Sequence, residues 1–111
     1  MITASFRLEG DRIVGFTVKG HGGLAEEGSD VLCAAVTSAV RLTECAVNDV
    51  LGLEASVKVR EKEASISLKL PSGLEETTET TCQTLLTAMM VYFTDLKEEY
   101  PDNIIVYDME V

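Results

Sequence analysis

The sequence predicts an α+β fold in which two helices pack on one face of a largely antiparallel, or mixed, sheet. Short segments that alternate apolar and polar residues occur as two consecutive pairs and once more at the end of the chain. Two longer segments with helical spacing of apolar residues separate them, which gives the order ββαββαβ. Strands joined by short turns pair antiparallel, and helices then cover one face of such a sheet. The 111 residues suit one domain, and we expect residues 1–111 to form a single one.

Each strand follows from a two-residue alternation of apolar and polar side chains. Residues 2–8 show this pattern, the turn EGDR follows, and residues 13–20 resume it, so these segments predict a hairpin. Residues 54–61 and 64–71 predict a second hairpin across a short EKE connection, and residues 103–111 predict a final strand. In the second hairpin we expect two pairs of apolar residues to face each other: Val57 and Val59 on one strand, Ile66 and Leu68 on the other.

Two helices are predicted, over residues 29–53 and 72–100. Ser29 or Asp30 can cap the start of the first, and Gly52 is a suitable stop. The first half of this helix is apolar around nearly its whole circumference, which predicts a central helix buried on most sides. The second helix has a narrower apolar stripe and a face of threonines and acids, so we expect it to be more exposed. That stripe consists of Cys82, Leu85, Leu86, Met89, Phe93 and Leu96.

The first residues and the cysteines of the chain indicate in which cellular compartment the protein is expected. The first ten residues lack the basic start and long apolar stretch of a signal peptide, and we expect no apolar run of the ~20 residues that span a bilayer. We therefore expect a cytoplasmic protein without a membrane partner. Three cysteines cannot all pair within one chain, so we read them as free thiols. With one histidine and no CxxC motif, we expect no metal site, and we expect no cofactor.

The formal net charge of −10 restricts the partners. We expect no direct contact with nucleic acid, because phosphates are repelled by such a surface and no basic stripe is evident to compensate. The same field attracts a basic partner.

A histidine and a cysteine form the main candidate site. His21 is the only histidine, and Cys33 follows it by twelve residues at the start of the first predicted helix. In the first turn of that helix, the dipole and the unpaired amides favour a thiolate, and the same amides can donate to an oxyanion. A neutral imidazole nearby can take the thiol proton. Asp30 can cap the helix, orient the imidazole, or do both.

Glycines surround the histidine and give the intervening loop the backbone freedom to fold back over the helix start. They are Gly20, Gly22, Gly23 and Gly28, and Ser29 completes the loop. Other interpretations stay open at this point. Cysteine is often a small core hydrophobe, and glycines before a helix can cradle a phosphate, although here acids and no lysine follow them. We interpret Cys45 and Cys82, both in mid-helix, as structural.

The stretch GHGGLAEEGSDVLCAAV resembles the signature of the bacterial ribosomal-processing cysteine protease family, often called Prp. That signature is a glycine–histidine pair, a loop with a glycine, an aspartate, two aliphatics, and a cysteine with small residues. The resemblance extends to chain length and to the late helix near EEYPDNI. Two positions depart from the pattern: Gly22 replaces a common alanine, and Thr37 replaces a serine four residues after the cysteine. Thr37 keeps the hydroxyl one turn below Cys33.

The resemblance implies a small homodimeric enzyme with a Cys–His dyad. Such enzymes remove a short N-terminal extension from large-subunit ribosomal protein twenty-seven, cutting after bulky apolar residues. His21 would then be the general base, Cys33 the nucleophile and Asp30 a supporting residue, with residues 22–29 as a mobile cover that orders around substrate. The basic precursor of that ribosomal protein would be the partner, which suits a chain of charge −10.

Two alternatives remain. A non-catalytic ribosome-assembly or adaptor module with the same fold would need no reactive Cys33. A redox or acyl-transfer protein would use the same activated cysteine. A redox role would also need a resolving thiol close by, and Cys45 lies about 18 Å along the same helix.

Overall fold

The computed structural model describes residues 1–20 and 29–111, and for Ser29 and Asp30 it describes the backbone alone. Its elements follow the predicted order ββαββαβ, so the α+β prediction is confirmed. The strands are β1 (Ile2–Glu9), β2 (Arg12–Gly20), β3 (Ser56–Arg60), β4 (Ser65–Lys69) and β5 (Ile104–Glu110). The two long helices are α1 (Ser29–Glu44) and α2 (Glu76–Glu99). A π-helical segment (Cys45–Val50) continues α1, and a short 3-10 helix (Glu61–Glu63) joins β3 to β4.

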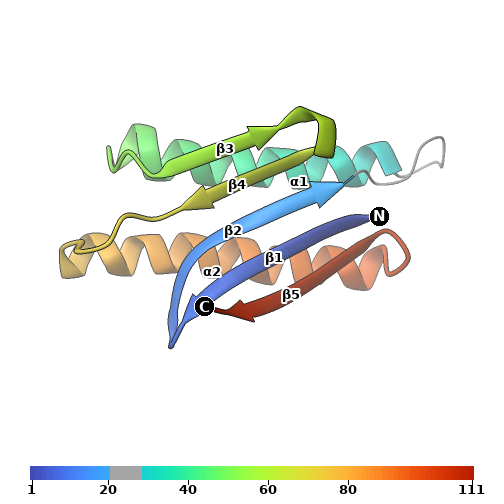
Figure 1. Cartoon of the computed structure of the whole chain (residues 1–111). Helices are drawn as coiled ribbons and strands as arrows, with labels where there is room; N and C mark the ends of the chain where they lie inside the picture. The colour runs from blue at the N-terminus through green and yellow to red at the C-terminus, as the bar shows by residue number, and fades with distance from the viewer. Residues whose placement is uncertain (21–28) are drawn as a thin grey trace.

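The five strands form one mixed sheet in the order β3-β4-β2-β1-β5, with β5 parallel to β1 and the other pairs antiparallel. Two connections cross over through a helix: β2 to β3 through α1, and β4 to β5 through α2. The strands from which they start, β2 and β4, are antiparallel, and the two connections run toward opposite edges of the sheet. Because crossovers are right-handed, this combination places both helices on the same face of the sheet. Figure 1 shows both helices behind the sheet and no helix in front of it.

The core lies between this sheet and the helices. Alternate residues of β1 and β2 point toward the helices, and their phenyl rings meet the ring of Phe93 from α2. The ring centroids of Phe6 and Phe16 are 6.2 Å apart, and those of Phe6 and Phe93 are also 6.2 Å apart. All three side chains are fully buried, so this aromatic cluster joins α2 to the sheet.

The apolar stripe of α2 is confirmed, whereas the prediction of a mostly buried α1 is wrong. Along α2 the buried residues are Cys82, Leu86, Met89, Phe93 and Leu96, and Leu85 is half-buried. On α1 only one side packs on the sheet, through Leu32, Val36 and Val40, while Val31 and Leu42 are 63% and 72% exposed. The reason is that α1 covers one half of the sheet beside α2, and no other described helix or strand packs on its outer side.

The first helix does not continue regularly to residue 53. It widens into the π-helical segment at Cys45, and Gly52 follows the end with a φ of +66°, a backbone conformation that suits glycine at a helix end. The Asn48 side chain then bonds both backbone groups of Ala55: the Ala55 N–H donates to Oδ1 at 2.7 Å, and Nδ2 donates to the Ala55 carbonyl at 3.2 Å. This side chain therefore fixes where β3 starts relative to α1.

One stretch of this helical region meets the length and composition expected of a membrane span. Val31–Val50 has a mean hydropathy of 1.3, contrary to our expectation that no run reaches such a length. A helix that packs an apolar stripe on a sheet passes the same test, and this one also carries Arg41, Glu44 and Asp49. The finding is weak evidence for a membrane span.

Polar contacts join α2 to the irregular end of the first hairpin. The pairing of β1 and β2 shifts between Arg7 and Leu8, as at a bulge. There the Gln83 side chain accepts the Ile13 N–H and donates to the Ile13 carbonyl, both at 2.8 Å. Beside it, Arg12 Nε lies 2.8 Å from Glu79 Oε1 in an ion pair. These contacts hold α2 against β2 at the end of the sheet away from Gly20.

Candidate active site

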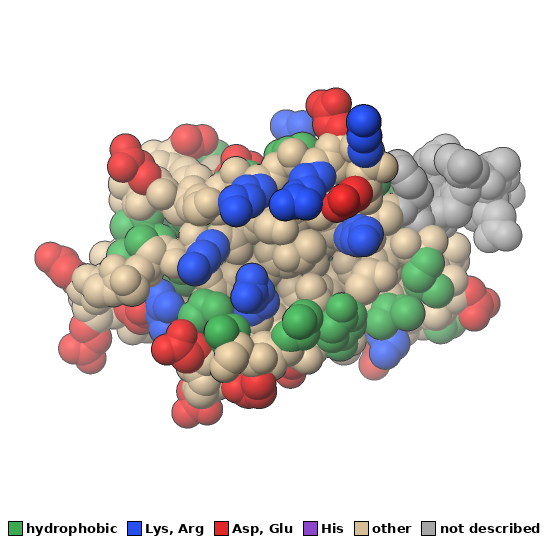
Figure 2. Space-filling model, in the orientation of Figure 1, with side chains coloured by type: hydrophobic (Ala, Val, Ile, Leu, Met, Phe, Trp, Pro, Cys, Tyr) green, Lys and Arg blue, Asp and Glu red, His purple; other side chains and the backbone are tan. Residues whose placement is uncertain are grey.

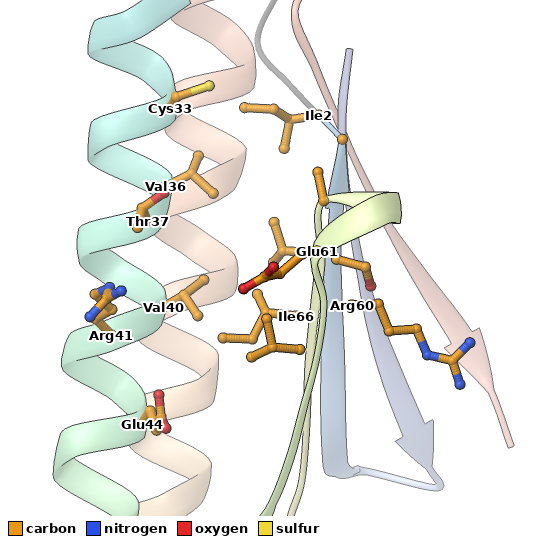
Figure 3. Close-up of a pocket in the computed structure, with 15 residues that line it drawn as sticks. Ile2, Cys33, Val36, Thr37, Val40, Arg41, Glu44, Arg60, Glu61 and Ile66 are labelled. Atoms are coloured by element: carbon orange, nitrogen blue, oxygen red, sulfur yellow. The ribbon is translucent and has the colours of Figure 1, made fainter.

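Cys33 is the fifth residue of α1 and its side chain is half-buried. The sulfur points from the helix toward Ile2 of β1 (Figure 3). The prediction placed Cys33 in the first helical turn, but the helix already begins at Ser29, so Cys33 begins the second turn. The amides that lack a partner within the helix belong to the residues just before it. Donors for a developing oxyanion are therefore within one turn of the sulfur.

A groove runs from Cys33 along α1, between this helix and the β3–β4 hairpin. Its volume is about 460 Å³. Cys33 lies at one end, and Glu44 marks the end three helical turns farther along (Figure 3). Apolar side chains make up most of its wall, from both layers of the fold: Ile2, Val18, Val36, Val40, Val59 and Ile66.

Gly20 lines the same groove at the end of β2. Its φ of +97° is a conformation that side chains rarely adopt, and a Cβ there would strike the carbonyl oxygen of Met1. Its N–H donates to the Ala64 carbonyl at 3.0 Å, which ties the strand end to the β3–β4 hairpin. Glycine is therefore required at position 20, because the start of β1 lies too close to the end of β2 to leave room for a side chain.

The polar wall of the groove comes from two elements. Thr37, one turn after Cys33, is exposed and lines the groove as expected from its spacing. Arg41 and Glu44 follow on the same helix. From the other side, Glu61 of the short 3-10 helix directs its carboxylate toward α1, while the Arg60 side chain turns away (Figure 3).

Several predicted site residues lie outside the described residues. These are His21, Gly22, Gly23 and Gly28, and for Ser29 and Asp30 only the backbone, in the first turn of α1, is described. The described structure does bring together Gly20, Cys33 and Thr37 around one groove. Gly20 directly precedes His21 in the chain, so the strand that leads to the histidine ends beside the groove that holds the cysteine.

Sequence reasoning missed the contribution of the β3–β4 hairpin to this groove. Val59 and Ile66 do pair as predicted, but they were read only as hairpin contacts. Val59 is 63% exposed in the structure, which marks it as groove wall rather than core. The sequence feature that could have indicated this role is the position of Val59 near the end of a strand, next to the charged EKE connection.

The two other cysteines differ in environment. Cys45 is exposed on the π-helical segment. Cys82 is buried on α2, where burial, and secondarily the charge of Glu79, raise the pKa of its thiol, while Arg12 acts in the opposite direction. No cluster of three or more metal-ligating side chains occurs within residues 1–20 and 29–111.

These environments predict an order of alkylation by iodoacetamide at neutral pH. We expect Cys82 to react slowest, because it is buried and its raised pKa keeps it protonated. A catalytic Cys33 is expected to react faster than Cys45 although it is less exposed, because exposure alone would give the opposite order. Peptide mapping by mass spectrometry gives the three rates. A Cys33 slower than Cys45 would favour a non-catalytic adaptor.

A half-buried thiol near the start of a helix, facing an apolar groove, suits an α+β hydrolase with a cysteine nucleophile. The comparisons agree with this class. The family model described as cysteine protease Prp matches residues 1–105, and the chain belongs to that family. It is a cysteine protease of the ribosomal-processing group, as the resemblance implied.

Relatives and solved structures support this membership. The chain is 31% identical over 105 residues to the ribosomal processing cysteine protease Prp of Bacillus subtilis, covering 94% of both chains. It shares the fold of SMU.848 from Streptococcus mutans, with a TM-score of 0.85 and 24% identity over 100% of this chain and 96% of that one. The Staphylococcus aureus Prp structure with a covalently linked product peptide has a TM-score of 0.78 and 18% identity, covering 98% and 100%.

Proposed function

We propose that this chain is an endopeptidase that removes a short N-terminal extension from large-subunit ribosomal protein twenty-seven, with Cys33 and His21 as a catalytic dyad. The observation that carries the proposal is the position of the Cys33 sulfur at the end of a long apolar groove. The family supplies the reaction class, and the Staphylococcus aureus member was solved with a substrate peptide.

The reaction assigns a step to each residue. The His21 imidazole takes the Cys33 proton, and the thiolate attacks the carbonyl carbon of the last residue of the extension. Amides at the start of α1 donate to the oxyanion that forms. The imidazolium then protonates the leaving amine, so a C–S bond has replaced the C–N bond. Water, deprotonated by His21, attacks the thioester, the C–S bond breaks, and the extension leaves as a carboxylic acid. The imidazolium returns its proton to the Cys33 thiolate, which restores the enzyme. Asp30 supports the imidazole in this scheme.

The groove supports cleavage after bulky apolar residues. Ile2 and Val36 lie next to Cys33, so the wall nearest the sulfur is aliphatic. Transfer of an apolar side chain from water to such a wall contributes about 25 cal/mol per Å² buried. Thr37, Arg41 and Glu44 offer polar groups along the open rim, where a peptide backbone or polar side chains of a substrate can bind.

The proposal includes a cytoplasmic homodimer. The outer side of α1 carries Val31 and Leu42, three turns apart, and Val50 beyond them is 75% exposed. Large apolar side chains in such a row support a protein–protein contact. Sedimentation equilibrium that gives the mass of a single 12.0 kDa chain would contradict this part of the proposal.

Incubation of the purified chain with the precursor of this ribosomal protein tests the proposal. We expect one cut, directly after a bulky apolar residue at the end of the extension, as read by mass spectrometry of both products. A precursor in which that residue is replaced by Asp is the matched control, and we expect it to stay intact because a carboxylate does not enter an aliphatic groove. Cleavage of neither precursor, or of both equally, would refute the assignment.

A further inference from the structure

No described helix or strand covers the face of the sheet opposite the helices, and the side chains of this face differ sharply from the rest of the chain. Both crossovers place their helices on one side, so the other side of all five strands faces outward (Figure 1). The strand register arranges its side chains in three rows across β3, β4, β2, β1 and β5. The rows are Ser56–Lys69–Gly15–Arg7–Met109, Lys58–Ser67–Thr17–Ser5–Tyr107 and Arg60–Ser65–Lys19–Thr3–Ile105.

This surface, which we call the basic sheet face, holds five of the nine cationic residues of the chain and no acidic one. All five cationic side chains are exposed. Since the whole chain has a formal charge of −10, the remainder carries −15. Figure 2 shows Lys and Arg gathered over the middle of this face, with one acidic side chain among them and most of the acidic side chains around the margin. Our expectation that no basic stripe exists is therefore wrong.

The cations of this face are not neutralised by the described part of the chain. Within residues 1–20 and 29–111, one ion pair forms, between Arg12 and Glu79. None of the five cations of the basic sheet face takes part in an ion pair with the described residues. Between the cations lie hydroxyl groups, of which Thr17 and Ser67 share a hydrogen bond of 2.9 Å. Exposed like charges raise the energy of the folded state unless a partner neutralises them.

A hollow of about 650 Å³ lies on this face. Four cations line it, Arg7, Arg12, Lys58 and Lys69, together with two carboxylates, Glu9 and Glu54. Gly15 forms part of its floor. A Cβ there would strike the carbonyl oxygen of Leu68, so the close pairing of β2 with β4 requires glycine at this point. The missing side chain leaves a depression between Lys69 and Arg7, which flank Gly15 in the same row.

We propose that the basic sheet face binds the phosphate backbone of a nucleic acid. Lys, Arg, Ser and Thr are the side chains that contact phosphate and sugar oxygens, and they make up the face over β1 to β4, apart from Gly15. Neighbouring strands lie about 4.8 Å apart, and alternate residues along a strand about 6.8 Å apart. The cations are thus spread over an area that several consecutive phosphates can contact together.

Two further features favour a nucleic acid over an acidic protein. Tyr107, on the edge strand in the middle row, is 44% exposed and offers a ring on which an unpaired base can stack. Over β1 to β4 the face consists of cations and small hydroxyl side chains around Gly15, with no large apolar residue to anchor a protein partner. The apolar Ile105 and Met109 are confined to the edge strand β5. Because the groove of Cys33 lies on the helix side of the sheet, both surfaces can be occupied at once.

Fluorescence anisotropy with a labelled twelve-nucleotide single-stranded RNA tests the proposal on the full chain. We expect saturable binding at low salt, with a log–log salt slope of about −3.5 if all five cations meet phosphates. The variant Lys58→Glu/Lys69→Glu is expected to bind at least ~10-fold more weakly. The variant Lys62→Glu/Lys97→Glu has the same net charge but alters exposed residues off this face, and it should bind within about 3-fold of the wild type.

Other outcomes overturn the proposal. No saturable binding at ~50 mM salt would do so. An equal loss in both variants would show that net charge alone controls binding. Polyglutamate that competes as well as RNA would indicate an acidic protein partner instead. The same anisotropy measurement with an RNA duplex distinguishes binding of paired from binding of unpaired nucleic acid. Cleavage of a ribosomal-protein precursor by the Lys58→Glu/Lys69→Glu variant, measured in parallel, separates failure of this inference from failure of the proposed function.

Discussion

The variant Cys33→Ala is expected to lose at least ~10³-fold in the rate of precursor cleavage, since no other group can form the acyl intermediate. The loss should fall on kcat, because the groove that binds the substrate stays intact. Cys33 is half-buried at the edge of the core, and removing one sulfur atom leaves its helix packed through Leu32 and Val36. We therefore expect the thermal unfolding midpoint to change little.

Two variants accompany this measurement. Cys45→Ala removes an exposed thiol twelve residues later and should cleave at the wild-type rate. His21→Ala removes the proposed base and should lose a similar factor to Cys33→Ala, with little further loss when the two changes are combined. Additive losses would mean that the two residues do not act as a pair. Cleavage retained by Cys33→Ala would refute its role as the nucleophile.

The largest expected effect on stability is that of Phe93→Ala. This side chain is fully buried, and its ring meets that of Phe6 at a centroid distance of 6.2 Å, so it joins α2 to β1. Loss of the ring leaves a cavity, and such changes cost about 3–5 kcal/mol. Small domains are stable by only about 5–15 kcal/mol, so the variant is expected to be partly unfolded at modest temperatures. Urea denaturation followed by circular dichroism gives the change in unfolding free energy.

The neighbouring residue provides the control. Tyr92 is also aromatic and lies on the same helix, but it is 43% exposed. Tyr92→Ala should therefore cost less than about 1 kcal/mol. Comparable losses for the two variants would mean that burial of the Phe93 ring does not set the effect, because Ala has a higher helix propensity than either aromatic residue, and would contradict the account of the core given above.

The order of elements followed from the sequence because each strand and helix has its own hydrophobic period. The alternation in residues 2–8 and the stripe on α2 both mark faces that are buried in the structure. The burial of α1 was predicted wrongly because its sequence does not mark a single apolar face. Its apolar residues occupy every side, so periodicity cannot show that only the side with Leu32 and Val36 meets the sheet.

The nucleophile could be predicted from local sequence, whereas its groove could not. Cys33 follows a helix start that the sequence marks with Ser29 and Asp30. The groove depends on how the β3–β4 hairpin packs beside α1, more than twenty residues later in the chain. The basic sheet face likewise depends on register, because Arg7, Lys58 and Lys69 become neighbours only when β1 and β3 join the same sheet.

The packing of Met1 against Gly20 has a practical consequence for fusion proteins. Ile2 lines the groove and the Met1 carbonyl lies where a Gly20 side chain would be, so any tag joined to the amino end starts beside the nucleophile. A flexible tag there would act as a tethered competitor of the substrate. Val111, whose N–H donates to the Leu8 carbonyl at 2.8 Å, lies at the opposite end of β1, and an affinity handle joined there leaves the reactive end open.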